Sequence, residues 1–281
     1  MPAQIIDGKK LATQLQGEIA TEVSRLSSSK GIVPGLVAVL VGNNEASKVY
    51  VRNKELACKK AGFLAEQHHL PETTSETELL QLIDQLNRDA KVHGILVQLP
   101  LPKHIDEQKI LRSIDPKKDV DGFHPVNMGN LLIGQPSMVP CTPLGIMRMI
   151  ESIGYRLEGK EAIVVGRSNI VGKPIALLLM QQNATVTIAH SKTANLPEKI
   201  GRADVVVAAL GRPEVIRGEW IKPGALVIDV GINRLPDGKL KGDVDFTGAS
   251  QRAAYITPVP GGVGPMTITM LLWNTLQAAK L

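Results

Sequence analysis

Hydrophobic positions in the N-terminal part of the chain alternate between helical spacing and short unbroken runs. Leucine, isoleucine and valine recur at helical intervals over 8–26, where the following SSSKG is expected to end the helix, and again over 76–89. The runs GLVAVLVG, 35–42, and GILVQLPLP, 94–102, are almost wholly apolar and are bounded by glycine or proline, which predicts buried strands. With a further strand expected at 64–70, this order predicts an α/β layer of parallel strands.

The C-terminal part carries a second series of apolar runs. The strands expected there are EAIVVG, ATVTIAH, DVVVAAL and ALVIDVG, at 161–166, 184–190, 204–210 and 225–231. The turn GRSNIVGKP joins the first run to the apolar helix segment IALLLM, and this strand–turn–helix order is typical of a Rossmann-type dinucleotide-binding sheet. A turn is expected at Asp237-Gly238, and a final helix over 266–279.

Between the two series, residues 115–145 lose helical periodicity and are rich in proline and glycine, which indicates a boundary or a segment that lines a cleft. A chain of 281 residues is long for one domain and comfortable for two. The sequence therefore predicts the α/β class with two α/β domains, 1–121 and 122–281, the second of Rossmann type.

Composition excludes several classes of partner. The formal charge of +5 is spread among acidic residues and only 3% of residues are aromatic, so nucleic-acid binding is not expected. The N-terminal MPAQIIDGKK lacks the apolar run of a signal peptide, and no window is apolar enough to span a membrane; a cytoplasmic protein is expected. Cys58 and Cys141 show no CxxC spacing, so neither a metal site nor a disulfide framework is expected.

Lys54 lies on an unexpected face of the helix predicted over SKVYVRNKELACKK, 47–60. The charged residues of the opposite face are Lys48, Arg52, Glu55 and Lys59. The neighbours of Lys54 at three and four residues are uncharged, so no ion pair along the helix supports it. Two interpretations remain open. Lys54 buries its stem and reaches water with its ammonium group, or its apolar surroundings let it accept and release a proton near neutral pH.

The turn GRSNIVG departs from the GxGxxG pattern of dinucleotide-binding proteins. Gly166 begins the turn, Ser168 replaces the second glycine, and Gly172 comes six residues after the first. Because the turn follows a buried strand and opens a helix, whose free N–H groups favour a pyrophosphate, we expect a dinucleotide there. A purely structural turn between strand and helix is the alternative.

Charge near this turn favours one dinucleotide. In NAD-binding sheets an acidic residue about 20 positions further on binds the ribose hydroxyls. Here the second strand ends in His190, Ser191 and Lys192, with no acid, and Arg167 lies in the turn itself. These groups would attract a 2′-phosphate, so the sequence predicts NADP rather than NAD.

Three further features have both a structural and a functional interpretation. Asp119 and Asp121 flank one valine, so an extended chain points them to opposite faces and only one is expected to face a ligand; the alternative is an Asx-turn before the next glycine. Gln98 lies in an apolar strand, where its amide needs partners, as a structural link or as a group that positions another side chain. PVPGGVGPMT, 258–267, suits a backbone that a ligand approaches closely.

Taken together, several segments resemble one enzyme family. VGNNEASKVYVRNK, GILVQLPLP, DVDGFHPVN, PCTPLG, VVGRSNIVGKP and PVPGGVGPMT stand in the order found in the bifunctional methylenetetrahydrofolate dehydrogenase/methenyltetrahydrofolate cyclohydrolases. The matching segments extend from Gly42 to Thr267. The resemblance implies a folate cleft between the two domains, a C-terminal helix, 266–281, that packs back on the first domain, and a homodimer.

The resemblance also implies a role for each matching residue. Lys54 would be the catalytic lysine, held by Gln98, while Tyr50 would stack on the folate and Asp121 would hydrogen-bond the pterin ring. The other folate-lining residues that it implies are Val97, Leu99, Pro260, Gly261, Gly262, Val263 and Gly264. The dinucleotide-binding residues that it implies are Gly166, Arg167, Ser168, Ser191 and Ile232. No metal is implied.

The implied reactions belong to tetrahydrofolate one-carbon interconversion, which serves purine biosynthesis. NADP⁺ would oxidise 5,10-methylenetetrahydrofolate to the methenyl compound, and water would then convert this compound to 10-formyltetrahydrofolate. Three alternatives are a monofunctional dehydrogenase, a folate- or nucleotide-binding protein without turnover, and a short-chain dehydrogenase with Tyr50 and Lys54 as a YxxxK pair. The last is disfavoured because the pair precedes the nucleotide turn by more than a hundred residues.

Overall fold

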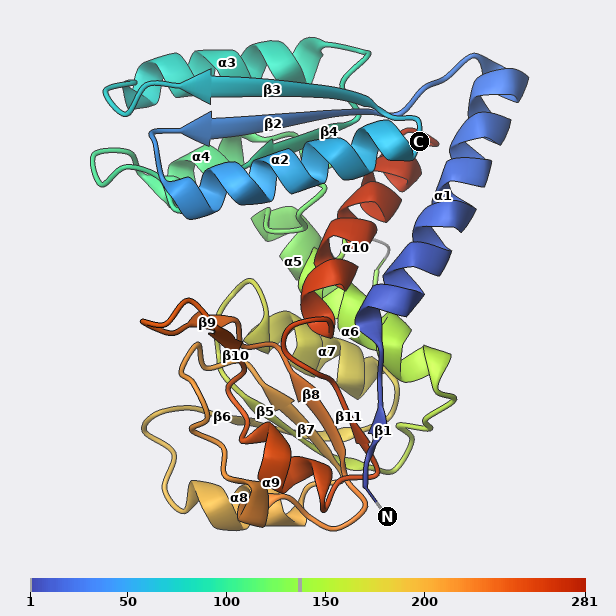
Figure 1. Ribbon diagram of the computed structural model, residues 1–281. Coiled ribbons are helices and arrows are strands. Elements are labelled where there is room, and N and C mark those ends of the chain that lie inside the picture. Colours follow the sequence, from blue (N-terminus) through green and yellow to red (C-terminus); the bar gives the residue numbers. More distant parts are fainter. Residues whose placement is uncertain (1, 136–137) are drawn as a thin grey trace. The chain divides into compact units, whose positions relative to one another are not determined.

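The computed structural model describes residues 2–135 and 138–281 (Figure 1). The described residues form two compact units, each built from two separated stretches of chain. Unit 1 contains the N-terminal residues to Thr13 together with Thr142–Thr267, and unit 2 contains Gln14–Cys141 together with Ile268–Leu281. None of the described helices combines the length and the apolar character that crossing a membrane requires.

Unit 2 contains a three-stranded parallel sheet in the order β3-β2-β4. The strands are β2 (Gly35–Val41), β3 (Leu64–Leu70) and β4 (Gly94–Val97). The helices that follow them are α2 (Glu45–Lys60), α3 (Glu76–Arg88) and α4 (Glu107–Ser113). The central strand β2 is buried along its whole length, which explains its unbroken apolar run. This confirms the α/β order that the hydrophobic pattern predicts.

The last strand of this sheet is shorter than expected. The apolar segment 94–102 is a strand only to Val97. Gln98 adds one more ladder bond, from its N–H to the Val39 carbonyl at 2.9 Å. Pro100 and Pro102 have no N–H to donate, so the ladder cannot continue through them.

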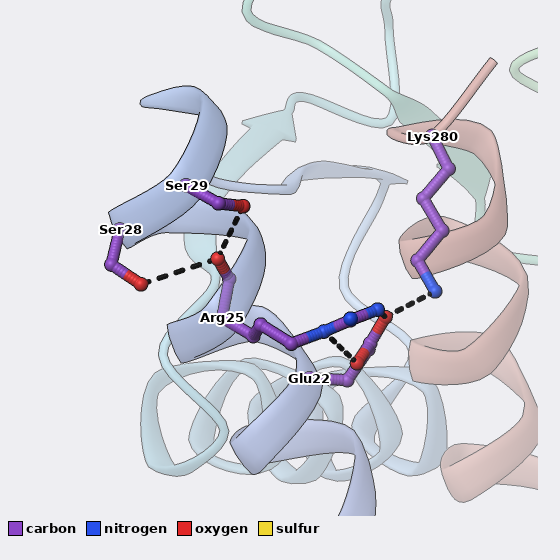
Figure 2. Close-up of polar contacts among 5 residues, drawn as sticks. All are labelled: Glu22, Arg25, Ser28, Ser29 and Lys280. Carbon is purple, nitrogen blue, oxygen red and sulfur yellow. Dashed lines mark hydrogen bonds and ion pairs between the residues drawn. The ribbon is translucent and has the colours of Figure 1, made fainter.

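Helix α1 (Gly8–Lys30) is longer than predicted, because the serines that were expected to end it remain helical. The hydroxyls of Ser28 and Ser29 donate to the Arg25 carbonyl, at 3.2 and 2.7 Å, as serines inside a helix commonly do (Figure 2). The helix ends before Gly31, whose φ of +67° suits a residue without a side chain.

Helix α10 (Val263–Ala278) completes unit 2 with its C-terminal part. There the Gln16 side chain donates to the Thr269 hydroxyl at 2.9 Å, which links α10 to α1. Glu22 of α1 accepts ion pairs from Arg25 and from Lys280, at 2.8 and 2.7 Å (Figure 2). These ion pairs lower the pKa of the Glu22 carboxyl to about 2. The N-terminal and C-terminal helices of the chain are thus joined by polar contacts.

Unit 1 contains a six-stranded parallel sheet in the order β1-β11-β8-β7-β5-β6. Its strands are β1 (Gln4–Ile5), β5 (Glu161–Val165), β6 (Thr185–Ala189), β7 (Val205–Ala208), β8 (Leu226–Asp229) and β11 (Tyr255–Ile256). Its helices include α6 (Cys141–Ser152), α7 (Gly172–Gln181), α8 (Leu196–Arg202), the 3₁₀ turn η1 (Gly218–Trp220) and α9 (Phe246–Ser250). The four predicted strands are present, and the strand order reverses at β5, as in dinucleotide-binding folds.

The predicted turn at Asp237-Gly238 is also present. It joins β9 (Asn233–Arg234) to β10 (Leu240–Lys241), which pair antiparallel. Gly238 has a φ of +82°, a conformation that glycine adopts without steric cost. The sequence did not predict β1 and β11, whose two-residue pairing gives no periodic signal.

Candidate active site

Lys54 of α2 has a specific partner in unit 2. Its Nζ donates a hydrogen bond to the Gln98 Oε1 atom at 3.1 Å. The Gln98 Nε2 atom donates to the Leu99 carbonyl at 2.8 Å, and the Gln98 N–H is held by Val39. Because its nitrogen is already used, the Gln98 side chain presents its oxygen to Lys54. The lysine that the helical pattern places on an unexpected face, Lys54, is therefore hydrogen-bonded to Gln98, the amide that was expected to need a partner.

Tyr50 lies one helical turn before Lys54 on the same helix. Its side chain is 45% exposed, which is unusual for a large aromatic residue. Residues four positions apart share a helix face, so the ring and the Lys54 side chain lie on one surface of α2. Val97 at the end of β4 is buried, and Leu99 is partly buried beside Gln98. This surface offers a ring for stacking next to a paired amine.

The two aspartates of DVDG have different surroundings. Asp119 is buried and accepts hydrogen bonds from the backbone N–H groups of Phe123 and His124, at 3.2 and 2.8 Å, and from the Asn127 side chain at 2.8 Å. These donors make Asp119 a structural residue of the turn. Asp121 is partly buried; burial raises its pKa to about 6, against the opposing charge of Lys54. Asp121 thus lies close enough to Lys54 for their charges to interact.

The sequence pattern did not identify Asn274, whose side chain is hydrogen-bonded to this turn. Asn274 of α10 is buried, and its Nδ2 donates to the carbonyls of Val120 and Val139, at 2.8 and 2.9 Å. The Cys141 thiol also donates to the Val120 carbonyl, at 3.2 Å. Asn274 lies more than a hundred residues from the turn in sequence, so no local pattern could identify it.

In the nucleotide turn of unit 1, backbone atoms pack directly against Gly166 and Gly172, where a side chain would not fit. A Cβ on Gly166 would come within 2.3 Å of the Ala209 carbonyl oxygen, and one on Gly172 would come within 2.3 Å of the Gly166 carbonyl oxygen. Ser168 is not a passive substitute for glycine. Its hydroxyl accepts hydrogen bonds from the N–H groups of Val171 and Gly172, both at 3.2 Å, where the turn enters α7.

The carboxyl edge of the same sheet carries exposed polar and basic groups. Arg167 is exposed in the turn after β5, and Ser191 and Lys192 are exposed after β6. The His190 Nδ1 atom accepts a hydrogen bond from the Lys192 N–H at 3.2 Å, which shapes this corner. The glycine turn, the helix start and these cationic side chains fit an NADP molecule at this edge. Among the described residues, no cluster of acidic, histidine or cysteine side chains could hold a metal ion.

Ile232 and the glycine-rich loop of unit 1 line one small cavity of about 140 Å³. The residues that line it are Asp229–Ile232, Leu240 and Pro258–Pro265. It therefore brings a residue implied for the dinucleotide beside the loop Pro260–Gly264 implied for the folate. A larger cavity of about 450 Å³, lined by residues of α6, of the segment after α6 and by Gln182 and Asn183 directly after α7, contains none of the candidate site residues.

The parallel sheets of the two units and the nucleotide turn define the class of the protein as an α/β enzyme of the NAD(P)-dependent kind. Comparison with known families shows to which family the chain belongs. The family model "Tetrahydrofolate dehydrogenase/cyclohydrolase, catalytic domain" matches residues 6–121. The model "Tetrahydrofolate dehydrogenase/cyclohydrolase, NAD(P)-binding domain" matches residues 140–281. The chain therefore belongs to the tetrahydrofolate dehydrogenase/cyclohydrolase family.

Individual relatives agree with this assignment. The "Bifunctional protein FolD" of Geotalea uraniireducens is 61% identical over 278 residues, which cover 99% of both chains. The crystal structure of the bifunctional enzyme FolD from Campylobacter jejuni has a TM-score of 0.98 and 48% identity, and 99% of each chain is covered. The Trypanosoma brucei FolD, solved with NADP cofactor and an inhibitor, has a TM-score of 0.95 and 43% identity, with 100% of this chain and 98% of its own covered.

Proposed function

We propose that this chain catalyses two successive reactions on one folate substrate. It oxidises 5,10-methylenetetrahydrofolate to the methenyl compound with NADP⁺, and it hydrolyses that compound to 10-formyltetrahydrofolate. Matches to both family domains, and full-length relatives named as bifunctional, support both activities and do not favour a monofunctional dehydrogenase. The NAD(P)-binding domain and the NADP complex of the Trypanosoma brucei relative support NADP as the cofactor.

The observation that carries the proposal for hydrolysis is the Lys54–Gln98 hydrogen bond beside Asp121. In this step a water oxygen bonds to the methenyl carbon, and the Lys54 amine takes the proton that the water loses. The added hydroxyl then loses its proton as the C=O bond forms and the ring C–N bond breaks, the released ring nitrogen takes up a proton, and the formyl group remains on the other nitrogen. The Gln98 oxygen holds the lysine amine in place for this transfer.

The other folate contacts are proposed from the same surface and from the glycine-rich loop. Tyr50 stacks on the folate, and Asp121 accepts a hydrogen bond from the pterin ring. The remaining lining residues are Val97, Leu99, Pro260, Gly261, Gly262, Val263 and Gly264. These contacts orient the one-carbon bridge, and orientation is the main requirement of the oxidation step.

The proposed cofactor residues are Gly166, Arg167, Ser168, Ser191 and Ile232. When bound, NADP⁺ supplies the hydride acceptor for the oxidation. The Gly166 backbone and the start of α7 would receive the pyrophosphate, and Arg167 and Ser191 would contact the 2′-phosphate. The proposed division is a catalytic domain over 1–121 and a cofactor domain over 122–281, with helix 266–281 packed on the first. The separate family matches, to residues 6–121 and 140–281, support a division into two parts and leave 122–139 unassigned.

The wider setting is also proposed. The chain forms a homodimer, as the family resemblance implies, and acts in the cytoplasm on one-carbon derivatives of tetrahydrofolate. Its scattered charge and scarce aromatic residues favour no nucleic-acid partner. Its product would serve purine biosynthesis.

Lys54→Met tests the proposed hydrolysis. The variant should hydrolyse the methenyl compound at least about a hundredfold more slowly, because it removes the proton acceptor. Loss of the methenyl absorbance over time measures this rate. Lys60→Met is the matched control, since Lys60 is exposed near the end of the same helix. Near-normal hydrolysis by Lys54→Met would exclude the role assigned to Lys54.

A further inference from the structure

Asp243 is a fully buried carboxylate that the proposed mechanism does not use. Its oxygens accept hydrogen bonds from three successive backbone N–H groups, those of Leu210 at 2.5 Å, Gly211 at 2.9 Å and Arg212 at 2.9 Å. A fourth donor is the side-chain amide of Asn233, also at 2.9 Å. A buried charge is tolerated only with such partners, and here the partners come from the segment after β7 and from strand β9.

A second buried carboxylate fixes the position of Asp243. Asp229, at the end of β8, accepts hydrogen bonds from the backbone N–H groups of Gly231, Asp243 and Val244, each at 2.9 Å. The packing is close, because a Cβ on Gly231 would come within 2.2 Å of the Asp243 Oδ1 atom. Asp243 therefore has little freedom to move away from the loops that it holds.

The loops held by Asp243 lie at the carboxyl edge of the six-stranded sheet. Residues 209–212 follow β7, and Asn233 begins β9, the next element after β8. In open α/β sheets, ligands bind outside this edge near the strand where the order reverses, which is β5 here. The Ala209 carbonyl oxygen lies directly against Gly166, since a Cβ on that glycine would come within 2.3 Å of it. A shift of 209–212 would therefore disturb the turn proposed to bind the dinucleotide.

We propose that Asp243 is a positioning residue for the dinucleotide. Its carboxylate fixes residues 210–212, which directly follow Ala209 at the Gly166 turn, and so shapes the site that NADP enters. This role rests on the proposed placement of NADP at the carboxyl edge. Asparagine has nearly the size of aspartate, but it has one accepting oxygen, and its NH₂ group would face N–H donors. Asp243→Asn therefore keeps the shape and loses part of the hydrogen bonding.

Asp245 provides a matched control two residues further on. Its carboxylate accepts hydrogen bonds from the backbone N–H groups of Gly248 at 3.1 Å and Gly218 at 3.4 Å, and it caps α9. Asp245→Asn removes the same charge from the same segment without removing a bond to residues 210–212. A rise in the KM for NADP⁺ that both variants share reflects lost charge or stability. A rise in Asp243→Asn alone reflects the lost hydrogen bonds to residues 210–212.

The experiment compares wild type, Asp243→Asn and Asp245→Asn as full-length chains. Asp243→Asn should raise the KM for NADP⁺ about tenfold, because hydrogen bonds to a charged group are lost. Its hydrolysis of the methenyl compound without dinucleotide should stay within about twofold of wild type, and so should the KM of Asp245→Asn for NADP⁺. An unchanged KM for NADP⁺ in folded Asp243→Asn would overturn the proposal.

If Asp243→Asn does not fold, Gly211→Ala tests the same loop. Gly211 has a φ of +66° and open space where a Cβ would lie, so alanine strains the loop backbone without a clash. The KM for NADP⁺ should rise in this variant as well, and an unchanged value would overturn the proposal. A wild-type enzyme that does not reduce NADP⁺ would instead refute the proposed function, so the two failures are distinguishable.

Discussion

Asp121 and Lys54 lie near each other in unit 2, and Asp121 should set the acid limit of activity. Burial raises its pKa from 3.8 to about 6, so the carboxylate is present above that pH and is lost as the pH falls through it. The ionised form accepts the hydrogen bond proposed from the pterin ring more strongly than the protonated form, whose O–H would face the donor or leave one oxygen to accept. The kcat/KM for methylenetetrahydrofolate should therefore fall about tenfold per pH unit below this pKa.

Asp121→Asn checks this assignment at the residue scale. Because asparagine does not titrate, the acid limb near pH 6 should vanish and leave a lower, flat profile. Initial rates of NADP⁺ reduction across this pH range measure both profiles. An unchanged acid limb in the variant would assign the titration to another group.

Arg167 should contribute to the choice of dinucleotide. Its guanidinium is exposed in the turn after β5, where it would contact the 2′-phosphate that only NADP carries. Arg167→Ala should raise the KM for NADP⁺ about tenfold and change that for NAD⁺ much less. Arg156→Ala, which removes another exposed arginine of unit 1, is the control. An equal loss with both dinucleotides would contradict the 2′-phosphate assignment.

At the scale of elements, α10 supports the segment that carries Asp121. Asn274→Leu would leave the Val120 and Val139 carbonyls without their amide donor. The Val139 carbonyl would then be unpaired, at a cost of about 1–3 kcal/mol, and the Val120 carbonyl would keep only the weak Cys141 thiol donor, so the free energy of unfolding should fall by about 2 kcal/mol. The KM for the folate should rise as well, because the Asp121 turn loosens. Denaturant unfolding and steady-state kinetics measure the two effects.

The neighbouring Thr275 is the control for this prediction. It is equally buried on α10, but its hydroxyl donates only to the Leu271 carbonyl of its own helix. Thr275→Val should therefore cost less than about 1 kcal/mol and leave the KM for the folate unchanged. Equal effects of the two variants would mean that Asn274 supports only the helix.

The ends of elements were predicted less well than their existence. The apolar runs located β2, β5, β7 and β8, because a strand covered on both faces needs no polar residue. The extension of α1 to Lys30 was missed because serine is common both after helices and inside them. In this structure the hydroxyls of Ser28 and Ser29 donate to the Arg25 carbonyl, which a sequence pattern does not reveal.

At the scale of the whole molecule, the proposed homodimer is directly testable. Light scattering coupled to size-exclusion chromatography should give about twice the mass of one chain, 30.2 kDa. Dilution through the micromolar range should show whether the assembly dissociates. A monomeric mass under conditions of full activity would remove the dimer from the proposed function.

The sequence by itself determined the class of the fold, the nucleotide turn and the side chains that resemble a folate active site. These features are local: a buried strand is an apolar run, a tight turn needs glycine, and a catalytic segment keeps its residues in order. Only the tertiary structure paired Lys54 with Gln98, Asn274 with the Asp121 turn and Asp243 with residues 210–212. Such pairs join residues far apart in sequence, and a buried polar group finds its partner only when folding brings the two segments together.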